Sequence, residues 1–340
     1  MTKPSNRQVR LHSRPTGIPQ AENFDIVETS VPELRDGEVL VRNIFLSVEP
    51  AMRGWVSSVA NYAEPVPVGG VMRSFATGRV VASRHPDYQP GDYVMGLFGW
   101  QDYAAVKTDA IQRKISGNHL PLSTSLGVLG LNGMTAYFGL LEVGQPQPNE
   151  TVVVSTAAGA VGSCVGQIAK LKGCHTLGIT GGPEKVQLCR ELFQYDNAID
   201  YKSDQFEQDL AKVCPQGVDV YFDNTGGCIS DAVLKHLNVG ARIVICGTAS
   251  IGSWEPVPLG PRVERQILVN RAHMQGVLVF DYADRYQEAV TALTQWVGDG
   301  LINYREDILQ GIEQAPDAIA GLYRGENLGK RLIQLEELVR

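Results

Sequence analysis

The sequence predicts an α/β protein with a β-rich module followed by a doubly wound parallel-sheet domain. Three observations lead to this fold class. The chain has 340 residues, which exceeds the size of about 250 residues at which single cores stop growing. Its first part contains short β-type runs separated by Pro and Gly. From Thr151 onward, apolar strand-like runs alternate with amphipathic helical ones, a pattern typical of βαβ units.

The N-terminal part is expected to form an irregular β-rich module. Its β-type runs are EVLVRNIFLSV (38–48), GRVVAS (78–83) and DYVMGLF (92–98). Pro90 and Gly91 stand where a tight turn between strands needs them. The C-terminal run at 329–338 follows a dinucleotide domain that is already complete, so we expect it to return to this module.

Six strands and their connecting helices are predicted after Thr151, in the order of a dinucleotide-binding domain. The predicted strands are 151–156, 174–180, 197–200, 218–224, 241–247 and 274–280, and the helices lie near 160–172, 184–194, 204–213 and 228–238. A last amphipathic helix, 282–300, ends at Gly300. The predicted domains are therefore 1–125 completed by 303–340, and 126–302.

Composition excludes several classes of protein. The formal net charge is -7 and no long basic run occurs, which argues against binding to nucleic acid or an acidic membrane. The basic N-terminus has no apolar stretch behind it, and no run approaches the ~18 apolar residues of a membrane span. The six cysteines form no C-x-x-C pair, so we expect reduced thiols in a cytoplasmic protein.

The loop after the first parallel strand has the pattern of a phosphate-binding turn. Residues 155–162 read STAAGAVG, with Gly159 and Gly162 in register with G-x-G-x-x-G and Ala157 at its first position. Gly159 would allow close approach of a pyrophosphate, and Gly162 would allow tight packing of the helix on the strand. Backbone N–H groups at the start of that helix are suited to bind phosphate. Ala157 is compatible with the turn if its φ is negative.

The end of the second parallel strand decides between NAD and NADP. NAD-binding domains place an Asp or Glu there to bind the ribose 2′-OH, whereas this chain has Gly181 and Gly182. Without a carboxylate, a 2′-phosphate is not repelled, and Lys185 on the following helix can pair with it. Glu184 lies in the first helical turn, where it favours the helix dipole and is expected to face solvent. The sequence therefore predicts NADPH/NADP+ as the cofactor.

Motifs spread over nearly the whole chain carry a family resemblance. They are EPAMRG (49–54), GGVM (69–72), GWQDY (99–103), LGVLGLNGMTAYFGL (126–140), AAGAVGSCVGQIAKLKGC (157–174), YFDNTGG (221–227), ARIVICG (241–247) and GENLGKRLIQL (325–335). In these motifs the chain resembles the zinc-independent medium-chain dehydrogenases/reductases. Within them it resembles the branch of prostaglandin reductase, or leukotriene B4 12-hydroxydehydrogenase, with plant alkenal double-bond reductases and bacterial NADPH-dependent curcumin reductase.

The resemblance implies a GroES-like catalytic domain built from both chain ends around a central Rossmann domain, in a homodimer. It also implies metal-free, NADPH-dependent reduction of the carbon-carbon double bond of small hydrophobic α,β-unsaturated ketones and aldehydes, by hydride transfer to the β-carbon. An NADPH quinone reductase is an alternative within the same class. A non-catalytic NADPH-binding or sensing protein is an alternative from another class.

Cofactor contacts follow from the resemblance by motif. They are Met134, Thr135, Gly159, Ala160, Val161, Gly162, Lys185, Tyr201, Asn224, Cys246, Gly247, Thr248, Val277, Val279, Asn327 and Gly329. The glycine turn would hold the pyrophosphate, Lys185 and Tyr201 the 2′-phosphate, and the two valines the nicotinamide. Ordinary structural roles remain the alternative for each of these residues.

Four residues are candidates for the substrate pocket. Gly252 stands where the family usually has a Tyr, and Trp254 two residues later is a candidate to occupy that space. Hydride addition to an enone produces an enolate that needs hydrogen-bond donors, for which the cofactor's ribose hydroxyl and Tyr62 are the candidates. Tyr62 and water are the alternative sources of the proton for the α-carbon. Arg53 is a candidate to attract an acidic or carbonyl substrate. A loop aromatic and a structural ion pair are the alternatives for Tyr62 and Arg53.

No metal is expected in the catalytic module. Residues 1–150 contain no Cys, and their only histidines are His12, His85 and His119. A catalytic zinc requires Cys or His ligands in a fixed geometry, with Zn–N distances of about 2.0 Å. Three histidines scattered in this way are better explained as surface or core residues.

Overall fold

The computed structural model describes residues 5–58, 62–115, 120–251, 256 and 258–335. The chain divides into two compact units: residues 1–126 with 306–340, called unit 1, and residues 127–305, called unit 2. The sequence predicts these divisions after residue 125 and before residue 303, one and three residues earlier in the chain. Within the described residues, no helix is long and apolar enough to cross a membrane.

Unit 1 is built on a seven-stranded sheet with the order β14-β15-β3-β4-β5-β7, in which β6 also pairs with β3. A separate two-stranded sheet joins β1 and β2. The strands are β1 Ser5–Leu11, β2 Phe24–Ser30, β3 Val39–Ser47, β4 Phe75–Ser83, β5 Tyr93–Leu97, β6 Tyr103–Val106, β7 Ile111–Ile115, β14 Glu306–Gln310 and β15 Lys330–Gln334, and the helices are α1 Met52–Val56 and α9 Ala315–Arg324. This is the β-rich GroES-like domain that the sequence predicts.

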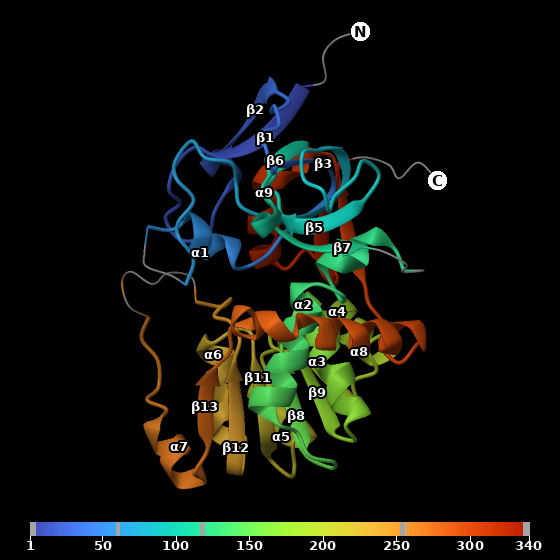
Figure 1. Ribbon diagram of the computed structural model, residues 1–340. Coiled ribbons are helices and arrows are strands. Elements are labelled where there is room, and N and C mark those ends of the chain that lie inside the picture. The colour runs from blue at the N-terminus through green and yellow to red at the C-terminus, as the bar shows by residue number, and fades with distance from the viewer. Residues whose placement is uncertain (1–4, 59–61, 116–119, 252–255, 257, 336–340) are drawn as a thin grey trace. The chain divides into compact units, whose positions relative to one another are not determined.

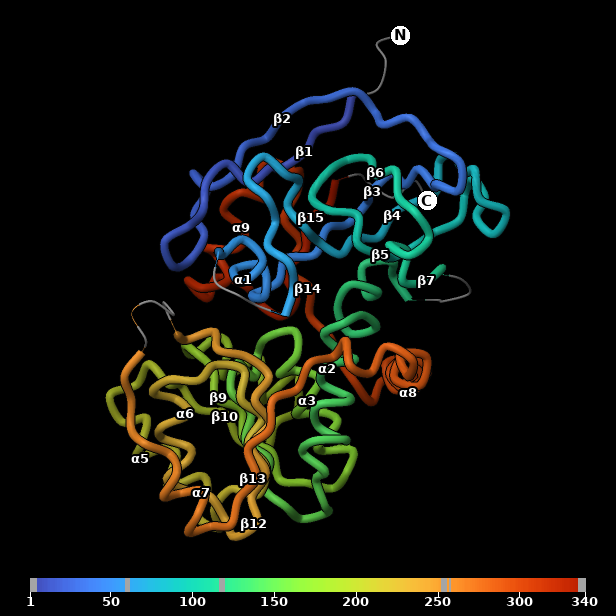
Figure 2. Tube along the Cα trace, turned by 60° about the vertical axis from the view of Figure 1, so that its left-hand side comes forward, coloured from blue at the N-terminus to red at the C-terminus, as the bar shows by residue number. Residues whose placement is uncertain are grey.

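The C-terminal segment completes unit 1. Strand β15 pairs antiparallel with β3, with Leu332 opposite Ser47, and Leu332 and Ile333 are fully buried. Figures 1 and 2 show this segment, with α9, in red among the blue N-terminal elements. The prediction that the C-terminal run returns to the β-rich module is therefore confirmed.

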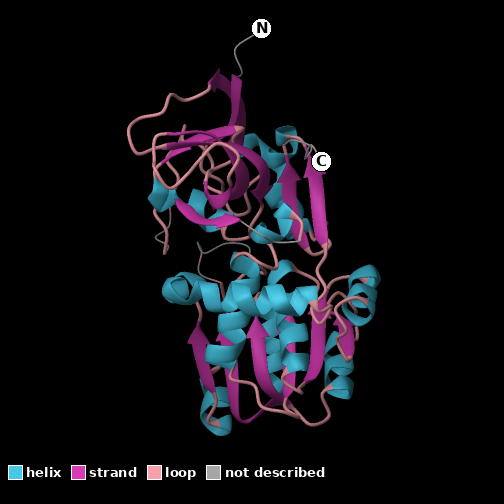
Figure 3. Cartoon of the chain, turned by 45° about the vertical axis from the view of Figure 1, so that its right-hand side comes forward, coloured by secondary structure: helices cyan, strands magenta, loops and turns pink. Residues whose placement is uncertain are grey.

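Unit 2 is a six-stranded parallel sheet with the order β10-β9-β8-β11-β12-β13, and helices cover both of its faces (Figure 3). The strands are β8 Thr151–Ser155, β9 His175–Thr180, β10 Asn197–Asp200, β11 Val218–Asp223, β12 Leu237–Ile245 and β13 His273–Gly276, and the helices are α2 Leu131–Phe138, α3 Ala160–Leu171, α4 Pro183–Glu191, α5 Phe206–Val213, α6 Gly227–Val233, α7 Glu264–Asn270 and α8 Tyr286–Gly298. The predicted dinucleotide-binding fold is confirmed.

Two predicted boundaries in unit 2 are wrong. The sixth strand ends at Gly276, because residues 279–285 form a 3₁₀ helix before α8. The helix predicted over 228–238 ends near His236, since Leu237 already pairs with Val218 in the sheet. Apolar residues in these stretches fit helix, strand and turn equally well, so periodicity alone does not separate them.

Candidate functional site

The predicted cofactor residues of unit 2 gather where the strand order reverses. Strand β8 lies between β9 and β11 in the sheet. The chain runs from β8 through β9 to β10 on one side of β8, and then crosses to β11, β12 and β13 on the other side. The glycine turn follows β8, Asn224 follows β11, and Cys246 with Gly247 follows β12. Ligands of open α/β sheets bind outside the carboxyl ends of the strands at this kind of switch point.

The phosphate turn, residues 155–162, adopts a compact strand-to-helix connection. Its left-handed residue is Thr156, with a φ of 53°, so Ala157 needs no glycine-like conformation. A positive φ is rare for a β-branched residue and marks local strain. A Cβ on Gly162 would lie 2.3 Å from the Thr156 carbonyl oxygen, and one on Gly159 would lie 2.9 Å from the Thr156 Cγ2. Both glycines are therefore required by close packing within the turn.

The turn delivers the N-terminus of α3 to the site. Gly159 is the N-cap residue in extended conformation, and no side-chain hydrogen bond caps α3 among the described residues. The first N–H groups of a helix have no acceptor within the helix, and the helix dipole is positive there. The backbone of residues 160–162 thus presents donors suited to a pyrophosphate.

A buried tyrosine that the sequence analysis did not single out supports this helix. The Tyr195 hydroxyl donates to the Gly162 carbonyl oxygen at 2.6 Å. Its ring occupies the space beside Gly166, where a Cβ would lie 2.1 Å from the Tyr195 Cζ. The first turn of α3 is therefore fixed from behind by a side chain that follows α4.

The acid-free turn after β9 lies beneath two side chains of the segment after β10. A Cβ on Gly181 would lie 2.9 Å from the Tyr201 Cε1 and 3.1 Å from the Lys202 Cε. Gly182 has a φ of 89° and is followed by α4, on which Lys185 lies in the first turn. A Cβ at Gly181 would fill this small depression between a phenol and an ammonium stem, so the residues fit a 2′-phosphate. Lys202 is the member that the sequence prediction missed.

Asn224 is held at the switch point by β8. Its backbone N–H donates to the Ser155 hydroxyl at 2.8 Å, and its Nδ2 donates to the Ser155 carbonyl at 2.7 Å. Cys246 and Gly247 donate their N–H groups to the Asp223 carbonyl at 2.8 and 3.1 Å. Three strand ends are thus tied together at the place where a cofactor of this fold binds.

The Asp223 carboxylate organises the turn after β11 from within the core. It is 2% exposed and accepts hydrogen bonds from the hydroxyls of Tyr221 at 3.0 Å and Ser230 at 2.5 Å, and from the N–H groups of Thr225 and Gly226 at 2.9 Å. A buried carboxylate needs this many donors to offset its lost hydration. The side chain therefore fixes the backbone that follows Asn224.

The remaining predicted cofactor residues of unit 2 lie on α2 and in the segments after β12 and β13. Met134 is buried on α2, and the Thr135 hydroxyl donates to the Leu131 carbonyl within the same helix at 2.6 Å. Thr248 is exposed. The Val277 N–H donates to the Ile245 carbonyl at 3.0 Å, and Val279 begins the 3₁₀ helix before α8. Roles for these residues toward a nicotinamide stay predictions.

Asn327 and Gly329 belong to unit 1, directly before β15. The Asn327 Nδ2 donates to the Gly329 carbonyl at 2.8 Å, and Gly329 has a φ of 76°. The next residue, Lys330, is 4% exposed. Its Nζ donates to the Ser47 hydroxyl at 2.7 Å, the Val48 carbonyl at 2.9 Å and the Glu49 carboxylate at 2.7 Å.

Two of the four candidate substrate residues lie near each other in unit 1. Arg53, on α1, is 3% exposed and its guanidinium lies 5.7 Å from the ring centre of Tyr323 on α9. Tyr62 is 53% exposed and acts electrostatically on the same Tyr323 phenol. The other two candidates, Gly252 and Trp254, lie outside the described residues.

Metal ligands are not grouped in the described part of the chain, where no three His, Cys, Asp or Glu side chains come together in a way that could hold an ion. His12 pairs with Asp25 at 2.7 Å, and the His85 ring lies 5.7 Å from that of Tyr88. His119 lies outside the described residues. The two described histidines thus occupy ordinary structural positions.

Five of the six thiols are shielded from solvent. Burial raises the pKa of Cys164, Cys189 and Cys246 to about 12, and that of Cys174 and Cys214 to about 11. The residue Cys246 is partly exposed although its thiol is buried. Cys228, on α6, is exposed.

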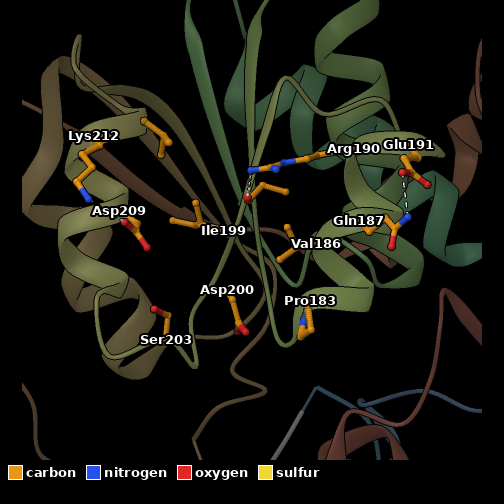
Figure 4. A pocket seen from close by; sticks show the side chains of 12 residues that line it. Pro183, Val186, Gln187, Arg190, Glu191, Ile199, Asp200, Ser203, Asp209 and Lys212 are labelled. Carbon is orange, nitrogen blue, oxygen red and sulfur yellow. Dashed lines mark hydrogen bonds and ion pairs between the residues drawn. The ribbon is translucent and has the colours of Figure 1, made fainter.

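A groove of about 630 Å³ runs along the outer edge of β10, between α4 and α5 (Figure 4). It is lined by Pro183, Val186, Gln187, Arg190, Glu191, Ala198, Ile199, Asp200, Ser203, Asp209, Lys212 and Val213. The Arg190 guanidinium closes part of the strand edge by donating to the Ala198 carbonyl at 2.8 Å. None of the predicted cofactor or substrate residues lines this groove, so it is distinct from the candidate site.

Comparison with known proteins follows the same division of the chain. A family model described as the N-terminal domain of oxidoreductase matches residues 7–113, and one described as zinc-binding dehydrogenase matches residues 160–295. The NADPH-dependent curcumin reductase of Escherichia coli (strain K12) is 44% identical over 338 residues, covering 98% of both chains. The chain belongs to the medium-chain dehydrogenase/reductase family. The resemblance seen in the sequence motifs is confirmed.

Further members of this family match over their whole length. The 2-alkenal reductase (NADP(+)-dependent) of Nicotiana tabacum is 37% identical over 337 residues, which is 97% of this chain and 98% of the relative. The crystal structure of CurA in complex with NADPH from Vibrio vulnificus superposes with a TM-score of 0.92 at 45% identity, covering 98% of this chain and 100% of that one. The chain is thus an oxidoreductase of the medium-chain family.

Proposed function

We propose that this medium-chain reductase uses NADPH to reduce the carbon-carbon double bond of α,β-unsaturated ketones and aldehydes. The observation that carries the cofactor is the turn at Gly181 and Gly182, which lacks an acid and lies under Tyr201 and Lys202. Relatives named for curcumin and 2-alkenal reduction with NADP(H) support the reaction class.

Different residues of the chain bind different parts of NADPH. The first turn of α3 binds the pyrophosphate through backbone N–H groups. Lys185, Tyr201 and Lys202 bind the 2′-phosphate, where two ammonium groups act as charge-assisted donors. Asn224, Cys246 and Gly247 line the cofactor at the switch point, and Asn327 with Gly329 contribute from the segment before β15.

Hydride addition to the β-carbon moves the double-bond electron pair onto the carbonyl oxygen and leaves an enolate. NADPH supplies that hydride. The enolate oxygen requires a positive group or donors, and Arg53 is a buried cation on the substrate side of unit 1. Tyr62 gives its hydroxyl proton to the α-carbon and regains one from water. The reaction that we propose needs no metal, and residues 1–150 contain no Cys that could ligate one.

A homodimer is the assembly that fits the exposed end of the parallel sheet. All four residues of β13 are exposed, and an unpaired strand edge favours pairing with another chain. Apolar side chains are exposed on the adjacent elements at Val239, Leu268 and Val269, and on β13 itself at Met274. Light scattering should show a dimer that Met274→Asp dissociates, and a monomeric wild type contradicts this assembly.

The reaction is tested by following NADPH oxidation with simple 2-alkenals and phenyl enones, with identification of the products. We expect saturated carbonyl products and a strong preference for NADPH over NADH. Stimulation by quinones without stimulation by enones would favour the quinone reductase alternative. Tight NADPH binding with no turnover on either panel would favour the non-catalytic alternative.

A further inference from the structure

The Glu49–Arg53 segment at the end of β3 is fixed by side chains from the far end of the chain. Ser47 and Glu49 hold the Lys330 ammonium at 2.7 Å each. Beyond them, the Tyr323 hydroxyl donates to the Pro50 carbonyl at 3.0 Å. Strand β15 and helix α9 thus fix the segment at two successive points.

Tyr323 also engages the guanidinium of Arg53. The phenolic oxygen accepts a hydrogen bond from Arg53 while it donates to Pro50, and the guanidinium carbon lies 5.7 Å from the ring centre. Arg53 is 3% exposed, so its orientation is set by contacts of this kind and not by solvent. An arginine in low dielectric stabilises a nearby negative charge more strongly than one in water.

Tyr62 is the third member of this cluster. Burial raises the pKa of the Tyr323 phenol above its ordinary value, Arg53 opposes the rise, and Tyr62 adds to it. Tyr323 therefore interacts with both residues that the sequence offered for the substrate side of unit 1. Its own hydroxyl is occupied by Arg53 and Pro50, which suits it for orienting these groups and not for contacting the substrate.

We propose that Tyr323 is a positioning residue of the reductase, which holds the Arg53 guanidinium in the orientation that stabilises the enolate formed by hydride addition. This inference rests on the proposed enone reduction. Tyr323 acts through Arg53. Removing the Tyr323 hydroxyl should therefore lower turnover only to the extent that the Arg53 guanidinium loses its orientation. The binding of NADPH, assigned mainly to unit 2, does not depend on it.

The test is a double-mutant cycle of Tyr323→Phe and Arg53→Gln, with Arg53→Lys as the conservative variant. Tyr323→Phe keeps the ring and removes the hydroxyl; we expect kcat for an enone to fall about tenfold with the KM for NADPH unchanged. The double variant should have the kcat of Arg53→Gln alone, because residues that act through one another are not additive. Arg53→Lys should retain more activity than Arg53→Gln, since it keeps the charge.

The matched control is Tyr286→Phe, which removes a buried hydroxyl on α8 and should leave kcat unchanged. Thermal unfolding and NADPH titration of every variant separate positioning from folding. Parallel losses of Tm, NADPH affinity and kcat in Tyr323→Phe would show a merely structural role, and multiplicative effects in the cycle would show that Tyr323 does not act through Arg53. Either result overturns the inference.

A wild type with no enone-dependent NADPH oxidation contradicts the proposed function and the inference together. A wild type that reduces enones, with Tyr323→Phe equal to it in kcat, contradicts only the inference. Should Arg53→Gln fail to fold, Arg53→Lys takes its place in the cycle, and the expectation of non-additivity is the same.

Discussion

The phosphate turn of unit 2 and the Glu49–Arg53 segment of unit 1 are both short connections at the end of a buried strand, but they are held in different ways. Backbone geometry and missing side chains shape the phosphate turn, where Gly162 leaves room for the Thr156 carbonyl. Charged and polar side chains from β15 and α9 hold the Glu49–Arg53 segment, across a sequence separation of 281 residues between Glu49 and Lys330.

The two connections differ in how far along the sequence their stabilising contacts reach. The close contacts that require Gly159 and Gly162 lie within the phosphate turn itself. Ile179, Asn224 and Tyr195 bind the turn from later in the chain. The contacts that hold the Glu49–Arg53 segment come from the C-terminal part of the chain, whose strand β15 pairs with β3. We therefore expect different effects when each connection is altered. Changes in the phosphate turn should lower the affinity for NADPH, and changes in the Glu49–Arg53 segment should lower stability or turnover.

The largest effect is expected from Lys330→Met. It removes the Lys330 ammonium from the buried Glu49 carboxylate, and the free energy of unfolding should fall by about 3 to 5 kcal/mol, measured by urea unfolding. Adding Glu49→Leu should restore much of this loss, because a buried pair can be replaced by apolar residues. The control Lys235→Met removes an exposed pair with Glu207 and should cost at most about 1 kcal/mol. Equal losses in the two single variants would show that the buried pair has no special role.

Removing the two cations beside Gly181 should alter cofactor selection without altering stability. For Lys185→Ala/Lys202→Ala we expect kcat/KM for NADPH to fall by at least about 100-fold with NADH unchanged, since each charge-assisted bond contributes about 1.5 to 3 kcal/mol. Calorimetric titration with 2′,5′-ADP checks the binding directly, and Lys212→Ala on α5 is the control. A variant that weakens NADPH and NADH equally would contradict recognition of the 2′-phosphate.

A methyl group in the phosphate turn gives the third test. Gly162→Ala places a Cβ 2.3 Å from the backbone oxygen of Thr156, so we expect a loss of about 2 kcal/mol in unfolding free energy and weaker NADPH binding by fluorescence titration. Gly298→Ala on α8 is the control, because nothing lies within 4 Å of its Cβ. Unchanged NADPH affinity in Gly162→Ala would show that the turn does not determine cofactor binding.

Local patterns in the sequence were sufficient to predict the dinucleotide domain and the choice of NADPH/NADP+. The order of strands, the glycine turn and the missing acid at Gly181 and Gly182 are all readable from neighbouring residues. Lys202 was missed although it follows Tyr201 directly, because a lysine in a loop is most often solvated. Only the packing of its stem over Gly181 distinguishes it.

The substrate side could not be predicted to the same depth. Arg53 and Tyr62 stand in one stretch of sequence, but nothing in that stretch indicates that both interact with Tyr323 on α9. Lys330 reads as an ordinary charged residue of a C-terminal strand until it is found buried against Glu49. Contacts of this kind depend on the pairing of β15 with β3, which periodicity does not specify in register.

The burial of the cysteines acquires a meaning from the proposed substrates. Conjugated enals and enones are themselves electrophiles that alkylate thiolates, and only the thiolate form of cysteine is an effective nucleophile. Burial raises the pKa of five thiols to about 11 or 12, so they remain protonated and shielded at neutral pH.

We therefore expect the folded enzyme to resist alkylation by the substrates that we propose for it. Mass spectrometry of the folded protein after brief exposure to a 2-alkenal should find adducts at the exposed Cys228 and few elsewhere, whereas protein unfolded in urea should be modified at all six positions. Rapid modification of Cys164 or Cys189 in the folded state would contradict this. Resistance to its own substrate is then a property of how the parallel-sheet domain packs its thiols.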